Sequence, residues 1–321
     1  MFSSLVPQSP DSLIQFRQPE RDILAQLLAD RRSPNTRRAY AYDLKQFFKA
    51  AAASNPTSEV IAAFLQLPRA QAIALVLDYK AGLLEQGLSE ARVNRSLSAI
   101  KALVRFAEGL GKCQWNLEIV PGEKTSSYRD TSGIDRESYR KIMAGCDRQT
   151  LKGKRDYALL RLLWDNALRR EETRTAIADF DAVNRTLRII GKGKGTQAET
   201  VTLSAPTTEA IAHWLAARGK TQPTDPLWIA LDSVHYGHRL TGDGLYKLVR
   251  GLAAAAGIEK RFSPHRVRHS SLTDALDRTG GDVRRVQKLS RHANIQTLMI
   301  YDDNRQNHQA EVTDLLAEGM D

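Results

Sequence analysis

A break in helical periodicity between residues 111 and 132 is the feature that most limits how this chain can fold. Before the break, apolar residues recur at helical spacing; within it, Pro, Gly, Ser and Thr occur without a period. The 321 residues are enough for two separate cores. We therefore expect a helical domain at 12–110, a linker at 111–132, a second domain at 133–305 and a tail helix at 306–321.

The first domain is expected to be entirely helical. Ser33 can cap a helix over 34–50, with Pro34 at its first position. Further helices are predicted at 70–86 and from 89 to 108, each followed by glycine. Their polar faces carry a set of basic residues, namely Arg37, Arg38, Lys45, Arg92, Arg95, Lys101 and Arg105.

The second domain is expected to combine helices with one small sheet. Two strand-like runs, Thr186–Ile190 and Glu199–Leu203, flank the sequence GKGKG and predict a β-hairpin. Helices are predicted at 135–146, 153–168, 207–218, 241–257, 266–279 and 282–290. The expected fold class is therefore mainly α with a small antiparallel β element (α+β).

Charge favours a polyanionic partner, and hydropathy indicates no membrane partner. The formal net charge is +10, and basic side chains that neutralise phosphates gain free energy from counterion release. No apolar run approaches the roughly 18 residues that span a bilayer, and the N-terminus lacks a secretory pattern. Cys113 and Cys146 have no CxxC spacing. We therefore expect a cytoplasmic protein.

Neither a metal nor another cofactor is predicted. There is no DxD-type acidic cluster, and His265 and His269 lack the intervening Glu of a HExxH zinc motif. GKGKG has the wrong spacing for the phosphate-binding loop GxxxxGK[ST]. Any phosphoryl chemistry would then depend on cationic side chains in place of Mg²⁺.

Six residues of the second domain are weak signals when taken singly. A helix-end arginine is favoured by the helix dipole, and a lone tyrosine is more often in a core or an interface. Together they supply the guanidinium and ammonium donors that hold a phosphodiester. They are Arg169, Lys192, His265, Arg268, His292 and Tyr301.

The order and spacing of the six resemble the tyrosine recombinases (the phage integrase family). An Arg at a helix end is followed by a Lys in a hairpin, HxxR at a helix start, and a His nine residues before a Tyr. The local segments read RIIGKGKG, SPHRVRHS and LSRHANIQTLMIY. In the first domain, SPNTRRAYAYDLKQF and GLSEARVNRSLSAIKALVRF resemble the family's core-binding helices. The resemblance covers about residues 20 to 305.

The resemblance implies a covalent mechanism. Tyr301 would attack the scissile phosphate, form a 3′-phosphotyrosyl link and release a 5′-hydroxyl. Lys192 would protonate the leaving oxygen, and His265 would assist proton transfer with Tyr301. Because the ester keeps the energy of the broken bond, religation would need no ATP.

The remaining residues would hold the phosphate. Arg169 and Arg268 would clamp its nonbridging oxygens, and His292 would donate a hydrogen bond to it. Glu172 matches the family's acidic supporting residue and would orient the arginine or histidine.

The sequence departs from the family pattern at a few positions. Ala167 and Arg291 stand where the family commonly has Gly. Lys194 is a second candidate for the general acid. The position of Lys192 relative to Arg169 favours Lys192 for this role. His269 is expected to be structural or to contact the DNA backbone.

The resemblance further implies a C-shaped clamp on double-stranded DNA with short inverted-repeat core sites. The acidic tail would contact a neighbouring protomer in a tetramer working on two DNA sites. Integration, excision, transposition and dimer resolution are all left open. Two competing functions are a type IB topoisomerase-like or telomere-resolvase activity, and a catalytically silent DNA-binding accessory protein.

Overall fold

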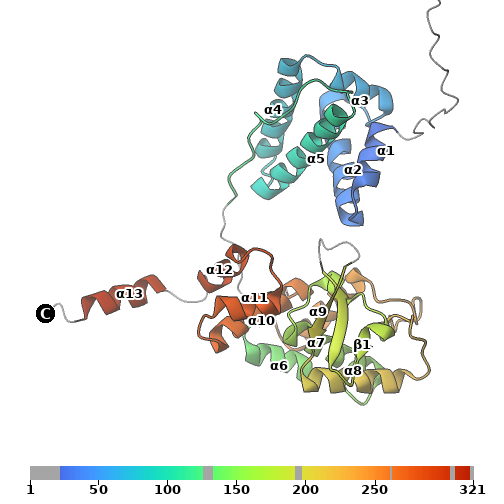
Figure 1. Ribbon diagram of the computed structural model, residues 1–321, viewed down its shortest axis with the longest axis vertical. Helices are drawn as coiled ribbons and strands as arrows, with labels where there is room; N and C mark the ends of the chain where they lie inside the picture. Colours follow the sequence, from blue (N-terminus) through green and yellow to red (C-terminus); the bar gives the residue numbers. More distant parts are fainter. Residues whose placement is uncertain (1–21, 126–132, 192–196, 261, 304–307, 319–321) are drawn as a thin grey trace, which may run out of the picture. The chain divides into compact units, whose positions relative to one another are not determined.

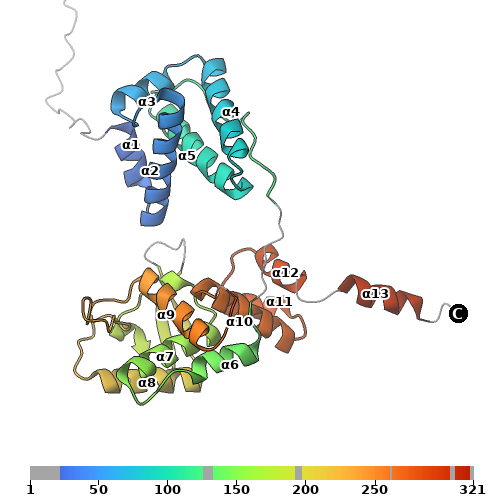
Figure 2. The same cartoon turned by 180° about the vertical axis from the view of Figure 1, so that it is seen from behind.

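The computed structural model describes residues 22–125, 133–191, 197–260, 262–303 and 308–318 (Figures 1 and 2). The chain divides into two compact units, Met1–Ser126 and Ser127–Asp321. The predicted fold class is confirmed: the described residues are mostly helical, with a three-stranded antiparallel sheet. Each unit is described below by itself.

The first unit consists of helices. They are α1 (Ile23–Asp30), α2 (Pro34–Ala52), α3 (Ser58–Leu65), α4 (Arg69–Glu85) and α5 (Glu90–Gly109). The predicted cap of α2 is confirmed, because the Ser33 hydroxyl accepts a hydrogen bond from the Thr36 N–H and Pro34 follows the cap. Periodicity did not predict α1 and α3, since helices of eight residues show few repeats of an apolar face.

Aromatic side chains form the centre of the first unit. Phe47 lies edge-on against Phe48, Phe64 and Tyr79, with ring centroids 5.0–5.3 Å apart. Trp115 joins this cluster from beyond α5 and donates its indole N–H to the Leu67 carbonyl at 2.9 Å. The first part of the predicted linker therefore packs on the helical unit rather than running free of it.

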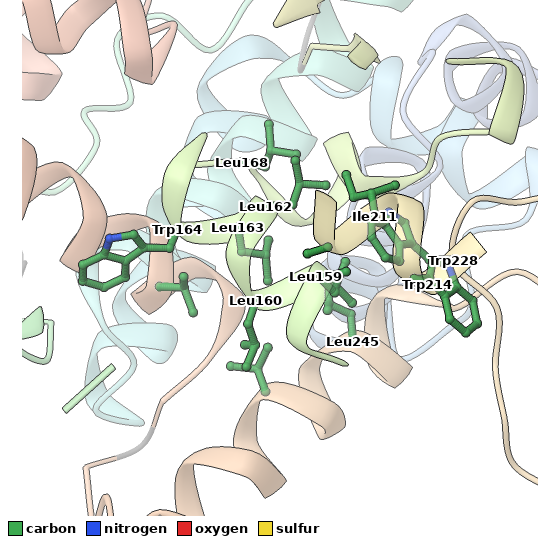
Figure 3. Close-up of a cluster of buried hydrophobic side chains, with 14 of the residues drawn as sticks. Leu159, Leu160, Leu162, Leu163, Trp164, Leu168, Ile211, Trp214, Trp228 and Leu245 are labelled. Carbon is green, nitrogen blue, oxygen red and sulfur yellow. The ribbon is translucent and has the colours of Figure 1, made fainter. Parts of the chain in front are cut away.

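The second unit is built around a buried helix. Its helices are α6 (Arg136–Ala144), α7 (Leu151–Asp165), η1 (Arg170–Thr173), η2 (Ile177–Asp179), α8 (Ala205–Arg218), α9 (Gly242–Ala255), α10 (Pro264–Arg278), α11 (Val283–Ser290), α12 (Gln296–Asp303) and α13 (His308–Ala317). Four leucines of α7 are fully buried, and Figure 3 shows them against Ile211 and Trp214 of α8 and Leu245 of α9; they are Leu159, Leu160, Leu162 and Leu163. Burial of this apolar surface is the main stabilising term for the unit.

The sheet contains β1 (Phe180–Asp181), β2 (Thr186–Ile190) and β3 (Ala198–Thr202) in that order. The predicted hairpin is confirmed, since β2 and β3 pair antiparallel from Thr186 opposite Thr202 to Ile190 opposite Ala198. Leu187 and Val201 face the core together, while the alternate side chains point away. The tip, 192–196, lies outside the described residues.

Across the described ranges, no single helix is both long and apolar enough to cross a membrane. The pair α3 and α4 meets the length and composition criteria together, but the two helices are bent by 116° at their junction.

Candidate active site and DNA-facing surface

Arg169 lies in a tight turn after α7. The sequence placed it at the end of a helix, but α7 already ends at Asp165 and the chain reverses through Ala167 at a φ of 45°. Arg169 itself is extended and precedes η1. This position leaves the Arg169 side chain 25% exposed, so it can reach a ligand that a side chain on the buried helix could not.

Glu172 fixes the position of Arg169 through two hydrogen bonds. Its carboxylate accepts the Arg169 backbone N–H and the Arg169 guanidinium, both at 2.8 Å. The same carboxylate accepts the Arg291 guanidinium at 2.7 Å. Glu172 is only 1% exposed; burial would raise the pKa of its carboxyl, but Arg291 and the bonds from Arg169 lower it below the ordinary value. Glu172 is therefore an ionised support, which agrees with its predicted role.

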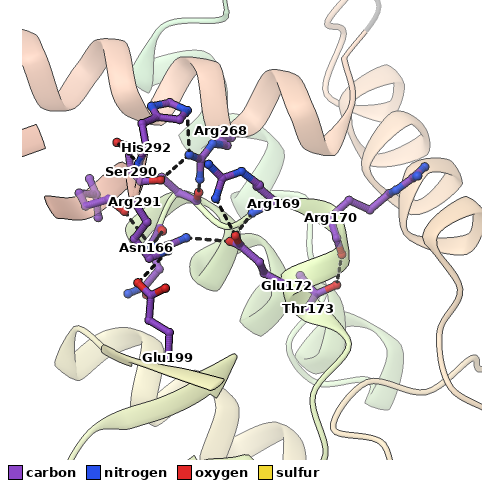
Figure 4. Close-up of polar contacts among 12 residues, drawn as sticks. Asn166, Arg169, Arg170, Glu172, Thr173, Glu199, Arg268, Ser290, Arg291 and His292 are labelled. Carbon is purple, nitrogen blue, oxygen red and sulfur yellow. Dashed lines mark hydrogen bonds and ion pairs between the residues drawn. The ribbon is translucent and has the colours of Figure 1, made fainter. Parts of the chain in front are cut away.

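Arg268 is a buried guanidinium on α10. The helix begins at Pro264, two residues before the predicted start at 266, and the Ser263 hydroxyl caps it by accepting the Arg266 N–H. Arg268 is 2% exposed and donates to the carbonyls of Ala167 and Ser290. These bonds join α10 to the Arg169 turn and to the end of α11 (Figure 4).

His292 completes the cluster. The Arg268 guanidinium lies 3.2 Å from its Nε2. Because guanidinium donates and never accepts, Nε2 is the acceptor and the ring proton sits on Nδ1. Burial lowers the pKa of His292 to about 4, reinforced by Arg268, Arg169 and Arg291 and opposed by Glu172. The ring is therefore neutral at physiological pH.

This protonation state has a measurable consequence. In NMR, the His292 ring should titrate near pH 4, and His292→Gln would assign the signal. Its folded pKa lies below the unfolded value, so the unfolded chain binds more protons between about pH 4 and 6.5. The contribution of His292 to the free energy of unfolding should therefore fall as pH drops through that window. A midpoint near 6.5 would contradict the assignment.

His265 lies one turn before His269 on α10. The Nε2 atoms of the two rings are 2.8 Å apart, with the ring planes nearly perpendicular. One ring must donate and the other accept, so their tautomers are coupled. The sequence missed this link: the i, i+4 spacing places both rings on one helix face, but it was considered only for zinc.

The side chains of two predicted residues lie outside the described part of the structure. Lys192 and its competitor Lys194 lie outside the described residues. Tyr301 lies in α12, and its side chain is likewise outside the description. The helix itself is anchored, because Leu298 is fully buried in a cluster with Ala167, Leu272, Leu276 and Val286. This cluster joins α12 to α10, α11 and the Arg169 turn, elements that lie side by side in Figures 1 and 2.

The assembled groups suit one kind of chemistry. Figure 4 shows Arg169 and Arg268 converging beside His292 over the Glu172 carboxylate, although the two arginines are far apart in sequence. Two guanidiniums fixed by bonds to protein groups are preorganised for an oxyanion such as a phosphate. Among the residues that the structure describes, no group of three His, Cys, Asp or Glu could hold a metal ion.

The first unit carries a second charged cluster, centred on Asp43 of α2. This carboxylate is fully buried and accepts two bonds from Arg95 of α5, at 2.8 and 3.0 Å. Arg92 lies 3.4 Å from the same carboxylate, with its guanidinium 5.0 Å from the Tyr42 ring centre. One buried anion on α2 thus orients two partly exposed cations on α5. Lys101, another of the predicted basic residues, donates to the Val120 carbonyl at 2.6 Å.

Known proteins resemble both units. Residues 133–308 match the phage integrase family, and residues 24–109 match the phage integrase N-terminal SAM-like domain. The chain is 52% identical to tyrosine recombinase slr0733 of Synechocystis sp. over 97% of its own length and 98% of that protein. It is 50% identical to tyrosine recombinase Synpcc7942_B2651 of Synechococcus elongatus, over 92% and 93% of the two chains.

Solved structures share the fold. The XerH site-specific recombinase bound to a palindromic difH substrate matches with a TM-score of 0.65 at 20% identity, covering 88% of this chain and 80% of that one. A lambda integrase dimer bound to a core site matches with a TM-score of 0.61 at 14% identity, covering 88% and 93%. With the family models and the close relatives, these findings show that the chain belongs to the tyrosine recombinases of the phage integrase family, enzymes that transfer DNA strands at specific sites.

Proposed function

We propose that Tyr301 is the nucleophile of this site-specific recombinase. Its phenolic oxygen attacks the scissile phosphorus, a 3′-phosphotyrosyl ester forms, and the 5′ oxygen of the broken strand leaves as a hydroxyl. Attack by another 5′-hydroxyl reverses these steps and releases Tyr301, so the reaction consumes no ATP. The ordinary pKa of a tyrosine is about 10, so attack at neutral pH needs stabilisation of the developing charge.

The convergence of Arg169 and Arg268 beside His292 is the observation that carries this proposal. In their assigned roles the two guanidiniums hold the nonbridging oxygens, and His292 lies beside Arg268 at the same phosphate. The donors are held in place before DNA arrives, because Arg169 is bonded to Glu172 and Arg268 to two carbonyls. Such preorganisation is usually the largest contribution to lowering a barrier.

Two proton carriers complete the proposed mechanism. Lys192 protonates the leaving 5′ oxygen from the tip of the β2–β3 hairpin. His265 assists the loss of the Tyr301 proton, and its bond to His269 gives that proton an onward acceptor.

We further infer that the working form is a cytoplasmic tetramer on two double-stranded sites, each with short inverted-repeat core sequences. The tail helix α13 supports protomer contact, because Val312, Leu315 and Leu316 are between 52% and 73% exposed. Apolar residues grouped on a short exposed helix gain free energy by docking in a partner.

Two other functions fit part of the same chemistry. A type IB topoisomerase-like or telomere-resolvase enzyme would use the same nucleophile, and a silent accessory protein would bind DNA without cutting it. The identity of about 50% to proteins named tyrosine recombinases, over nearly the whole chain, favours recombination over both.

A nicked suicide-substrate library distinguishes these functions. Recombination predicts that the protein becomes covalently attached to a limited set of sequences, which sequencing of the trapped DNA would identify. Efficient relaxation of a plasmid that lacks those sequences would instead favour the topoisomerase. The absence of any covalent adduct would favour the accessory protein.

The Asp43 cluster leads to a prediction for DNA binding. Two bonds to Asp43 leave three of the five Arg95 N–H donors for a DNA phosphate. Arg95→Gln should weaken DNA binding several-fold and reduce the slope of log affinity against log salt by about 1. Fluorescence anisotropy over a salt series would measure both.

Arg69→Gln is the matched control. It removes the same charge from an exposed position at the start of α4. If the two variants change the salt slope equally, Arg95 contributes only bulk charge and the α2–α5 surface is not the one that contacts DNA.

A further inference from the structure

Arg291 occupies an unfavourable backbone position. It follows the last residue of α11 with a φ of 55° and a ψ of 34°, in the left-handed region. Glycine adopts this conformation freely, whereas the Cβ of any other residue makes it unfavourable. A side chain at such a position is retained most readily where its own contacts offset that cost.

The contacts of Arg291 are extensive. Its side chain is only 9% exposed, and its guanidinium donates a hydrogen bond to the Glu172 carboxylate at 2.7 Å. It also donates to the carbonyls of Asn166 at 3.2 Å and Leu289 at 2.7 Å. On the far side its Nε lies 3.9 Å from the Glu199 carboxylate of β3. Figure 4 shows it between the end of α11, the Arg169 turn and the hairpin strand.

These contacts join three segments that carry assigned catalytic residues. Glu172 and Asn166 flank the Arg169 turn, Glu199 lies on the strand that follows the Lys192 loop, and His292 is the next residue along the chain. Arg291 itself has no assigned catalytic role, because its guanidinium donates to Glu172 and to backbone carbonyls. Its effect would therefore be exerted through its neighbours.

Sharing of Glu172 explains why a second arginine is useful. Without Arg291, the guanidinium of Arg169 alone would balance the charge of the buried carboxylate. The positive charge of Arg169 would then be neutralised by Glu172 and less available to a phosphate. With Arg291 on the other oxygen, the carboxylate is already balanced. Arg169 then keeps its positive charge for the substrate at little cost.

We propose that Arg291 is a positioning residue that holds the Glu172 carboxylate, so that Arg169 remains available to the scissile phosphate. The proposal rests on the proposed function, since it assigns Arg169 to that phosphate. It adds a residue outside the six that bear the chemistry.

Arg291→Gly is the direct test, because glycine removes the side chain and suits the left-handed backbone. Single-turnover cleavage of a suicide substrate should fall about 10- to 100-fold, as is typical when a supporting contact is lost. Arg291→Lys keeps the charge but not the planar fork, and it should lie between wild type and Arg291→Gly. Arg140→Gln, an exposed charge on α6, should cleave like wild type.

A double-mutant cycle separates positioning from general loss of structure. If Arg291 acts through Glu172, then Arg291→Gly should cost clearly less in a Glu172→Gln background than in wild type. The same fold loss in both backgrounds, or full activity of Arg291→Gly, would overturn the proposal.

A readout without cleavage keeps the two proposals distinguishable. Arg291 helps to lower the pKa of His292, together with burial, Arg268 and Arg169 and against Glu172. In Arg291→Gly the NMR midpoint of His292 should rise, and an unchanged midpoint would count against close placement of Arg291. If wild type forms no covalent adduct, the proposed function fails, while this titration still decides whether Arg291 shapes the cluster.

Discussion

Tyr301→Phe is expected to abolish covalent attachment to DNA. The substitution removes one oxygen and keeps the aromatic ring, so the phosphorus has no nucleophile. Cleavage of a suicide substrate should fall by roughly 10⁴-fold or more, as when other enzymes lose their nucleophile. Denaturing electrophoresis of protein incubated with labelled substrate would show the loss of the adduct.

The control for Tyr301→Phe is a second tyrosine in the same unit. Tyr236 is 62% exposed in the loop before α9, and Tyr236→Phe should form adducts like wild type. DNA affinity should be nearly unchanged in both variants, because the phenol oxygen is not needed for binding. Persistent adducts in Tyr301→Phe would mean that another residue is the nucleophile.

Arg268→Lys is expected to have the second-largest effect. The guanidinium spans two carbonyls and His292, and a single ammonium cannot reach all three. Single-turnover cleavage should fall by about 10²- to 10³-fold, the typical loss for a preorganised oxyanion donor. A buried carbonyl left without its donor should also lower stability, by about 1–3 kcal/mol. Cleavage rates and thermal denaturation would measure the two effects.

Arg169→Lys is the informative partner of Arg268→Lys. Arg169 is 25% exposed, and its main support is one carboxylate. The variant Arg169→Lys should lose cleavage activity, but its loss of stability should be smaller than that of Arg268→Lys. Equal losses of stability in the two variants would contradict the division into one buried arginine and one partly exposed arginine.

The sequence determined much of the fold because the signals involved are local. Helix caps, apolar periodicity and glycine stops depend on neighbouring residues, so Ser33 marked a helix start correctly. The strands on either side of GKGKG were found for the same reason. The family followed from the order of six residues, which folding does not change.

The tertiary structure alone decided how the charges are shared. Arg268 and the carbonyl of Ala167 lie about a hundred residues apart, and Arg291 and Glu172 are still more distant in sequence. No periodicity links such residues, because their contact depends on how α7, α10 and α11 pack. Likewise, only burial beside three guanidiniums lowers the pKa of His292 from its ordinary value to about 4. The sequence thus determined the family and predicted a set of site residues, and long-range packing decided which of the described arginines is buried among carbonyls and which stays partly exposed.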